Sequence, residues 1–216
     1  MRGVQFGEYH TATDWNLILN SKNIDPPTPK IVKVSVDGRD GDLNLSRALS
    51  GDMKFNNRVA SFTFLVTGGS YESRDALINE IINAVHGQEL QIIEPDDEDH
   101  FLVGECSVKS VVNNKAYGSF TVSADCEPYR YLVDDINRVI VATATPTDIV
   151  LHNTGRKTLT PTITVEGEVI LKFGSSEVGL STGSYKLSAL HLKTGPNIVT
   201  VSGTGTITFT YREAVL

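Results

Sequence analysis

Hydrophobic and polar residues alternate along much of this chain, which is the pattern of β-strands with one buried face. In residues 31–36 every second position is a valine, and Phe62 and Phe64 share one face of residues 59–66. Phe120, Val122 and Ala124 alternate with polar residues in the same way. The pattern predicts strands over residues 31–36, 59–66, 89–93, 101–112 and 115–126.

One stretch, residues 72–86, has apolar positions at helical spacing instead. Ser70 or Ser73 can cap its start, and Gly87 suits the position after its end. This spacing predicts a single amphipathic helix that packs on a sheet.

The amino-acid composition changes after Thr145, where Thr, Ser and Gly become frequent and no helical pattern appears. Short strands at near-regular spacing with turn signals between them predict an antiparallel β-sandwich. The predicted strands cover residues 162–165, 168–173, 184–192, 197–201 and 206–212. We therefore expect a mainly β protein with a first domain over 1–131, a connecting segment over 132–144 and a second domain over 145–216.

Charge is distributed unevenly along the 216 residues, whose formal net charge is −7. Six Lys or Arg and five Asp or Glu lie from Thr145 onward, so the negative charge belongs to the preceding part. Proteins hold duplex nucleic acid mainly through Lys and Arg on its phosphates, so this acidity argues against nucleic-acid binding. No apolar run reaches the roughly 18–20 residues of a membrane helix, so we expect no membrane insertion.

Two cysteines, Cys106 and Cys126, flank an Asn113-Asn114 pair that resembles a two-residue hairpin turn. That register places Cys106 opposite Thr121 and separates the two cysteines by about 17 Å along the strand, too far for a disulfide. We expect two free thiols.

A cluster of five carboxylates is the one candidate metal site. It comprises Glu94, Asp96, Asp97, Glu98 and Asp99. The cluster lacks the glycine-punctuated loop of an EF-hand, and the five histidines show no metal-ligand spacing. A solvated hairpin turn is the preferred interpretation, with no metal or other cofactor.

The sequence evidence for a catalytic site is as weak as that for a metal site. Glu166 and Glu168 flank a glycine and could act as paired carboxylates, but this arrangement is more typical of a turn. No nucleophile motif or phosphate loop is present, so we expect no enzyme. Tyr185 is the best candidate for a sugar contact on the second domain.

Several segments, in this order, resemble the distal tail proteins of long-tailed phages and prophages. The first two are Phe6-Gly7 with Trp15, and Asn57-Arg58 with Ser61–Val66 and the helix ending at His86-Gly87. The others are the acidic turn with Gly104 and Cys126-Glu127-Pro128-Tyr129, and Thr194-Gly195-Pro196-Asn197-Ile198 with Gly203 and Thr206–Arg212. The resemblance covers nearly the whole chain.

This resemblance implies a tail-tube-like β-barrel or sandwich that carries one helix, followed by a galectin-like β-sandwich. It implies a hexameric ring at the virion tail tip, made in the cytoplasm of the bacterial host. The ring joins the tail-tube protein to a tail-associated hub protein, anchors receptor-binding proteins and lets DNA pass. The short second domain places sugar-binding or fibre-docking insertions in doubt.

Subunit contacts can be placed on the sequence because exposed strand edges need covering and closed head-to-tail contacts build rings. We expect contacts at the N-terminal arm with Trp15, at the 37–44 loop, and at the Asn113-Asn114 tip. Within that loop the candidate residues are Asp37, Arg39 and Asp42. Alternative hypotheses are a carbohydrate-binding module that acts through the second domain, a tail-tube protein, and a hydrolase.

Overall fold

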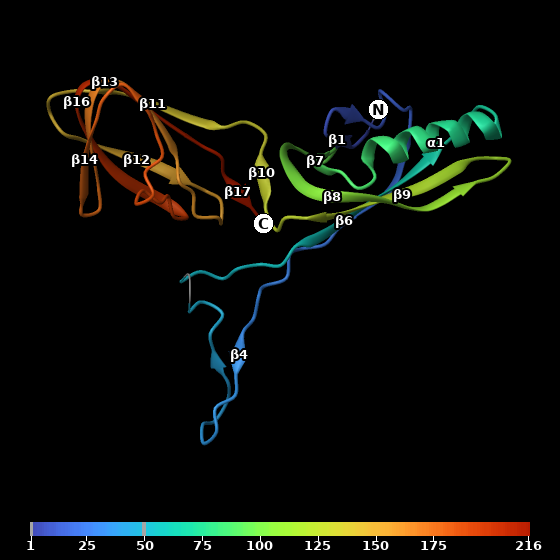
Figure 1. Ribbon diagram of the computed structural model, residues 1–216, viewed down its shortest axis with the longest axis horizontal. Helices are drawn as coiled ribbons and strands as arrows, with labels where there is room; N and C mark the ends of the chain where they lie inside the picture. Colours follow the sequence, from blue (N-terminus) through green and yellow to red (C-terminus); the bar gives the residue numbers. More distant parts are fainter. Residues whose placement is uncertain (1, 49–50) are drawn as a thin grey trace. The chain divides into compact units, whose positions relative to one another are not determined.

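The computed structural model describes residues 2–48 and 51–216 of the chain. The chain divides into two compact units, Met1–Arg130 and Tyr131–Leu216. Figure 1 shows the single helix of the described residues, α1 (Tyr71–Val85), in the first unit and an all-strand second unit.

The first unit is built on an antiparallel sheet with the strand order β2-β1-β7-β8-β9-β6-β3. Its strands are β1 (Gln5–Phe6), β2 (Tyr9–His10), β3 (Ile18–Ile24), β6 (Arg58–Val66), β7 (Glu89–Glu94), β8 (Asp97–Asn113) and β9 (Gly118–Cys126). A separate pair, β4 (Lys33–Val34) and β5 (Leu43–Asn44), is shorter than the strand predicted over residues 31–36. The N-terminal arm supplies β1 and β2 to the main sheet.

Alternation along β6 and β9 creates the core of this unit. Phe62, Phe64 and Phe120 are fully buried, whereas the residues between them face the other side of the sheet. Helix α1 covers the buried face with Ile78 and Ile81. Burying each such side chain contributes about 1.5–3 kcal/mol, so this face organises the unit.

Helix α1 begins and ends where its sequence predicts. The Ser70 hydroxyl accepts the Ser73 N–H at 3.2 Å and caps the first turn. The His86 N–H donates to the Ile82 carbonyl, and Gly87 follows with φ of +74°, a conformation that favours glycine. The predicted helix is confirmed.

The β8–β9 hairpin has a different register from the predicted one. Its connection is Asn114–Tyr117, with Val112 opposite Ser119 and Asn113 opposite Gly118. A bulge after Lys109 shifts the register by one residue back toward the predicted one, yet Cys106 still lies opposite Ala124 rather than Thr121. Cys106 and Cys126 are therefore closer than predicted, yet both are free and buried. The prediction of free thiols is confirmed, but the separation used to reach it was wrong.

The second unit is an antiparallel β-sandwich, as predicted. Its strands are β11 (Ile136–Ala142), β12 (Thr147–Asn153), β13 (Thr162–Phe173), β14 (Ser176–Leu180), β15 (Gly183–Tyr185), β16 (Gly195–Tyr211) and β17 (Ala214–Val215). Strand β17 pairs with β10 (Arg130–Leu132). The segment 132–144, expected as a connection, contributes β11. The strand predicted over 184–192 ends at Tyr185.

Two long strands, β13 and β16, replace four predicted short ones. Strand β16 pairs with β12 through Gly195–Val201 and with β11 through Gly205–Tyr211, so it serves both layers of the sandwich. Gly167 of β13 lies opposite Gly205 of β16, at the point where β16 begins to pair with β11 instead of β12. A Cβ on Gly205 would lie 2.1 Å from the Glu166 carbonyl oxygen, and both glycines have positive φ. Glycine at these two positions permits a bend in a continuous strand, although the local sequence predicted a turn at each.

The described residues form open sheets, and none of these sheets closes into a barrel. The expected fold of the first domain was a β-barrel or a sandwich. The structure does not support a closed barrel within one copy. Among the same residues, no helix is both long and apolar enough to span a membrane.

Candidate functional site

The most extensive candidate surface is the side of the first sheet that faces away from the core. We call it the open face; it is formed by alternate residues of four neighbouring strands, β8, β9, β6 and β3. Its residues are Glu105, Ser107, Lys109 and Val112 of β8, Ser119, Thr121, Ser123 and Asp125 of β9, Val59, Ser61, Thr63 and Leu65 of β6, and Ile18, Ser21 and Asn23 of β3. Most are hydroxyl-bearing or charged, so the face is suited to contact with water.

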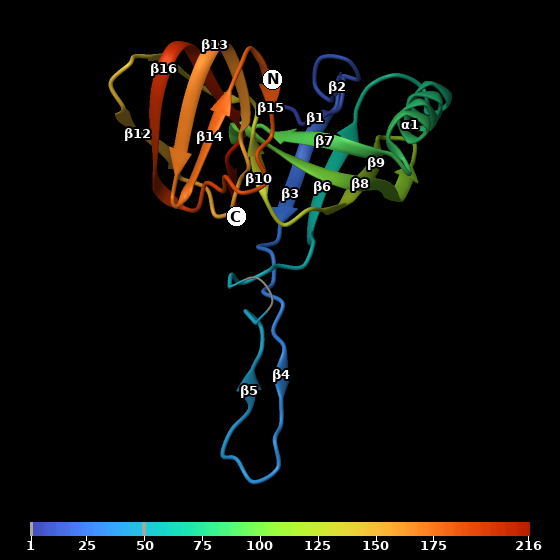
Figure 2. The same ribbon diagram turned by 60° about the vertical axis from the view of Figure 1, so that its left-hand side comes forward.

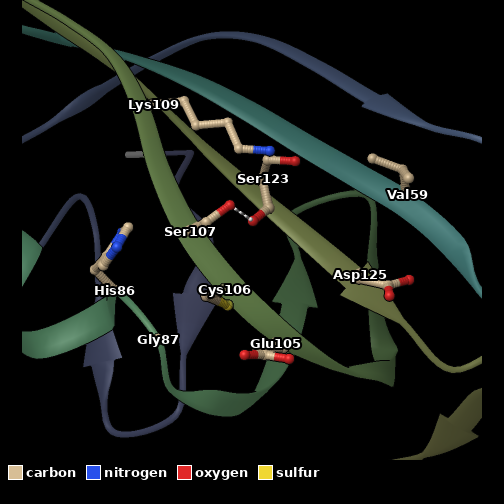
Figure 3. A pocket seen from close by; sticks show the side chains of 9 residues that line it. All are labelled: Val59, His86, Gly87, Glu105, Cys106, Ser107, Lys109, Ser123 and Asp125. Carbon is tan, nitrogen blue, oxygen red and sulfur yellow. Dashed lines mark hydrogen bonds between the residues drawn. The ribbon is translucent and has the colours of Figure 1, made fainter.

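Hydroxyl groups in the middle of the open face bond to one another or to the backbone. The Thr63 and Thr121 hydroxyls lie 3.0 Å apart across β6 and β9. The Ser107 hydroxyl donates to the Ser123 carbonyl at 3.1 Å, as Figure 3 shows. These bonds hold short side chains close to the sheet.

A row of carboxylates crosses one end of the open face. Glu89 of β7 is opposite Glu105 of β8, and Glu105 is opposite Asp125 of β9. All three side chains are exposed. Like charges at directly opposite positions destabilise a sheet, so this row is an electrostatic cost that folding alone does not explain.

Two residues of this row, Glu105 and Asp125, border a hollow of about 390 Å³. Figure 3 shows Glu105 and Asp125 on the rim with Val59 on the neighbouring strand. No ion pair of the described residues neutralises Glu89, Glu105 or Asp125. Nor do the described residues contain three or more Asp, Glu, His or Cys arranged to hold a metal ion.

The acidic turn predicted from the sequence is a different feature and is neutralised locally. Lys22 pairs with Glu94 and Asp96. Asp97 accepts from Arg130 Nη1 at 2.8 Å and lies 2.7 Å from His100 Nδ1. Cations of the same unit therefore occupy carboxylates of the turn, consistent with the preferred interpretation as a hairpin turn.

A projecting hairpin, residues 25–48 and 51–57, joins β3 to β6. Figures 1 and 2 show it extending beyond the ends of these two strands. Ile31 and Val32 are 59% and 51% exposed, and Val34 and Val36 are exposed as well. The predicted contact residues Asp37, Arg39 and Asp42 lie at its tip and are all exposed. Isolated two-stranded hairpins are at best marginally stable in water, so these apolar side chains call for a partner surface.

Trp15, another predicted contact residue, lies inside its own unit. Its side chain is 5% exposed and stacks on Tyr9 with ring centroids 5.0 Å apart. Its Nε1 donates to Glu80 of α1 at 3.3 Å. The structure therefore places Trp15 in the core rather than on an exposed surface.

The predicted hairpin tip is fastened to α1. The Asn113 side chain accepts from Arg74 Nε at 3.3 Å and donates to the Tyr71 carbonyl at 3.0 Å. The Asn114 carbonyl accepts from Arg74 Nη2, and the Asn114 side chain accepts the N–H groups of Ala116 and Tyr117. Both asparagines thus have defined intramolecular roles.

The candidate residues of the second unit lie apart from any convergent polar site. Tyr185 is half-buried against the core, and its hydroxyl donates to the Ser181 carbonyl at 2.9 Å, so it offers no exposed aromatic platform. Glu166 and Glu168 lie on the continuous strand β13, opposite Thr206 and Thr204. They do not flank a turn.

Comparison with known proteins identifies the fold as that of a phage adsorption hub. One solved structure with this fold is that of SPP1 Dit, described as a paradigm of the hub adsorption apparatus of phages that infect Gram-positive bacteria. The TM-score is 0.72 at 15% identity, over 98% of this chain and 99% of that one. The chain therefore has the Dit fold along almost its whole length, and the resemblance predicted from the sequence is confirmed in the fold.

A second solved structure, the phage P2 baseplate in its activated conformation with Ca, matches with a TM-score of 0.47. The identity is 8%, over 99% of this chain and 98% of that one. No family model matches the chain, and no curated protein matches it.

Proposed function

We propose that this protein is a non-enzymatic structural hub of a long-tailed phage or prophage tail, assembled as a ring at the tail tip. The observation that carries the proposal is the two-unit Dit fold, shared over almost the full length of both chains. The proposed role in a tail-tip ring rests on that likeness together with the open face and the projecting hairpin.

The open face supports a role as the lining of the ring. A channel that DNA traverses must not retain phosphate, and a surface of mostly hydroxyl-bearing side chains with a carboxylate row meets that requirement. The row formed by Glu89, Glu105 and Asp125 lies on the side opposite the core, where a copy of this chain can present it to a lumen. Its electrostatic cost in the single chain then has a functional explanation.

The projecting hairpin supports a role in contacts between subunits. Its exposed Ile31, Val32, Val34 and Val36 gain burial when they pack on a second copy of the chain. Asp37, Arg39 and Asp42 at the tip would set the orientation of that contact. Trp15 and the Asn113-Asn114 tip, the other predicted contacts, have intramolecular partners in the single copy.

The partners follow from the position of a hub. The ring would receive the tail-tube protein on one side and a tail-associated hub protein on the other. The second unit would face outward and anchor receptor-binding proteins. We place the protein at the virion tail tip after synthesis in the bacterial cytoplasm.

The alternative functions have less support. A carbohydrate-binding role through Tyr185 would need an exposed ring, whereas Tyr185 is half-buried with its hydroxyl engaged. A tail-tube protein would leave the second unit unexplained. A hydrolase would need facing carboxylates in a cleft, and Glu166 and Glu168 lie along one strand.

Light scattering with mass determination tests the proposal. The chain has a mass of 23.5 kDa, and we expect the purified protein at high concentration to have about six times that mass. A protein that stays at the single-chain mass at every concentration would contradict the ring.

A further inference from the structure

A hollow of about 480 Å³ lies on the outer surface of the second unit, on the side of the sheet away from the core. Strands β14, β13 and β16, which pair in that order, form most of it, and Figure 2 shows β14 beside β13. The connection between β11 and β12 also lines the hollow. The Gly203 N–H donates to the Thr143 carbonyl at 2.9 Å and holds this connection against β16.

One glycine in this hollow has no explanation within the single chain. Ile170 of β13 lies between Gly179 of β14 and Ser202 of β16. The φ of Gly179 is not in the left-handed region, and a Cβ at this position would have no heavy atom within 4 Å. Strands β13 and β14 pair without a register shift, so no bulge requires glycine either.

Glycine within a strand is destabilising relative to alanine. Where neither a bend nor a bulge accounts for it, such a glycine marks a place that a ligand or another backbone approaches closely. Gly179 therefore indicates that the hollow has an occupant, which a methyl group at this position would obstruct.

The hollow combines an apolar surface with one carboxylate. Ile170 is 46% exposed, and Ala144 is exposed as well. Glu168 lines the same hollow, and no ion pair of the described residues includes it. Ser202 and Thr204 add hydroxyl groups. A long basic side chain suits this combination, because its stem can cover Ile170 while its cation reaches Glu168.

Arginine fits the hollow better than lysine does. Its guanidinium is planar, so it can lie flat over Gly179, where no side chain intervenes. It also pairs with a carboxylate through two hydrogen bonds and is less strongly hydrated than an ammonium group. Arginine is enriched among the residues that dominate binding at protein interfaces, which favours a protein as the source of this side chain.

We propose that the hollow receives an arginine side chain of a protein that is anchored on the second unit. The guanidinium pairs with Glu168, and the stem packs on Ile170. This inference rests on the proposed role of the second unit in anchoring receptor-binding proteins, and it identifies the point of attachment.

Methyl NMR of the full chain tests the site directly. Ala144, Val169, Ile170 and Leu180 all line the hollow and carry methyl groups. The probe is a blocked tripeptide with arginine between two glycines, at millimolar concentration. It should shift these methyl signals in a saturable manner, whereas the same tripeptide with norleucine in place of arginine should not.

Gly179→Ala separates binding from folding. It should leave the melting temperature unchanged or raise it, yet weaken binding of the arginine tripeptide by about tenfold, because the new methyl group blocks the approach. An alanine variant that binds the tripeptide as tightly as the wild type does would overturn the assignment.

Glu168→Gln should weaken binding of the tripeptide by about threefold to tenfold, since it removes the charge from the pair. Glu177→Gln is the matched control, because Glu177 is an exposed carboxylate of β14 that lies opposite Lys172. Equal effects of these two substitutions would show that the cation does not pair with Glu168.

The mass of the oligomer, measured on the same samples, separates this inference from the proposed ring. A ring whose methyl signals do not respond to the arginine tripeptide contradicts the site and leaves the ring standing. A monomer that binds the tripeptide supports the site and contradicts the ring. If N-acetylglucosamine shifts these methyl signals and the arginine tripeptide does not, the hollow is a saccharide site and the proposed protein anchor is wrong.

Discussion

The Arg74 guanidinium donates from Nη2 to the Asn114 carbonyl at 2.5 Å, joining the first turn of α1 to the tip of the β8–β9 hairpin. The same side chain donates from Nη1 to the carbonyls of Gly68 and Gly69 at 3.2 and 2.9 Å. It is 4% exposed, and no ion pair of the described residues includes it. Neutral acceptors thus stabilise a buried cation, which makes this contact a structural link between helix and hairpin.

Replacing Arg74 should therefore destabilise the first unit. Arg74→Met keeps most of the apolar stem but removes every hydrogen bond of the guanidinium. We expect the free energy of unfolding of this unit to fall by about 2–3 kcal/mol, because several acceptors lose their partner. Urea unfolding followed by circular dichroism measures the change.

Lys115→Met is the matched control, since Lys115 is an exposed cation in the same hairpin loop. It should change the free energy of unfolding by no more than about 0.5 kcal/mol. Equal effects of the two substitutions would show that Arg74 does not link the helix to the hairpin.

Gly205 should be intolerant of a side chain where β16 changes partner. A Cβ there would lie 2.1 Å from the Glu166 carbonyl oxygen, and its φ is +152°. We expect Gly205→Ala to cost about 2 kcal/mol or more and to lower the melting temperature of the second unit. Gly179→Ala is the control, because a Cβ at that position would have no heavy atom within 4 Å and the φ of Gly179 is not in the left-handed region. A well-tolerated alanine at 205 would contradict the proposed bend.

Most of the strands and the helix could be predicted because their periodicity reflects which face is buried. Alternation in residues 59–66 and the spacing over 72–86 depend only on local sequence, and both elements formed as predicted. Gly167 and Gly205 misled the prediction for a physical reason. A glycine that relieves close backbone contact between two strands has the same local sequence as one in a turn.

The candidate site was harder to predict because it depends on register. Glu89, Glu105 and Asp125 are far apart in sequence and form a row only through the pairing of β7, β8 and β9. The one sequence signal for this row was that each of the three predicted strands carries an acidic residue on its polar face. The hairpin connection Asn114–Tyr117 is longer than the predicted two-residue turn, and together with the bulge after Lys109 it changed which residues face each other.

The two native thiols should be unreactive in the folded protein. Burial raises the pKa of Cys106 and of Cys126 from 9.0 to about 12. The thiolate is the reactive form, so we expect almost no labelling by a thiol reagent at pH 8 until the protein is unfolded. Rapid labelling of the native protein at pH 8 would contradict the buried positions.

The same raised pKa values predict alkaline destabilisation. The folded chain retains thiol protons that the unfolded chain releases above its ordinary pKa of 9.0. The contribution of these groups to stability is complete below pH 9 and is lost as the pH rises toward about 12. Replacing both cysteines with alanine should reduce this part of the pH dependence, which unfolding curves at graded pH would measure.

Calcium should not stabilise the acidic turn. Lys22 and Arg130 already neutralise carboxylates there, and a hard cation would have to displace them. We expect millimolar calcium chloride to leave the melting temperature unchanged. A clear rise, abolished by Asp97→Asn, would show that the turn is a metal site after all.

We propose that copies of this chain form a ring whose inner surface is the open face. Electron microscopy of the purified oligomer, with image averaging to strand resolution, tests it most directly. We expect a closed ring with a central channel lined by Glu105, Thr121 and Thr63. A closed particle with α1 toward the channel and the open face outside, or no ring at any concentration, would contradict it.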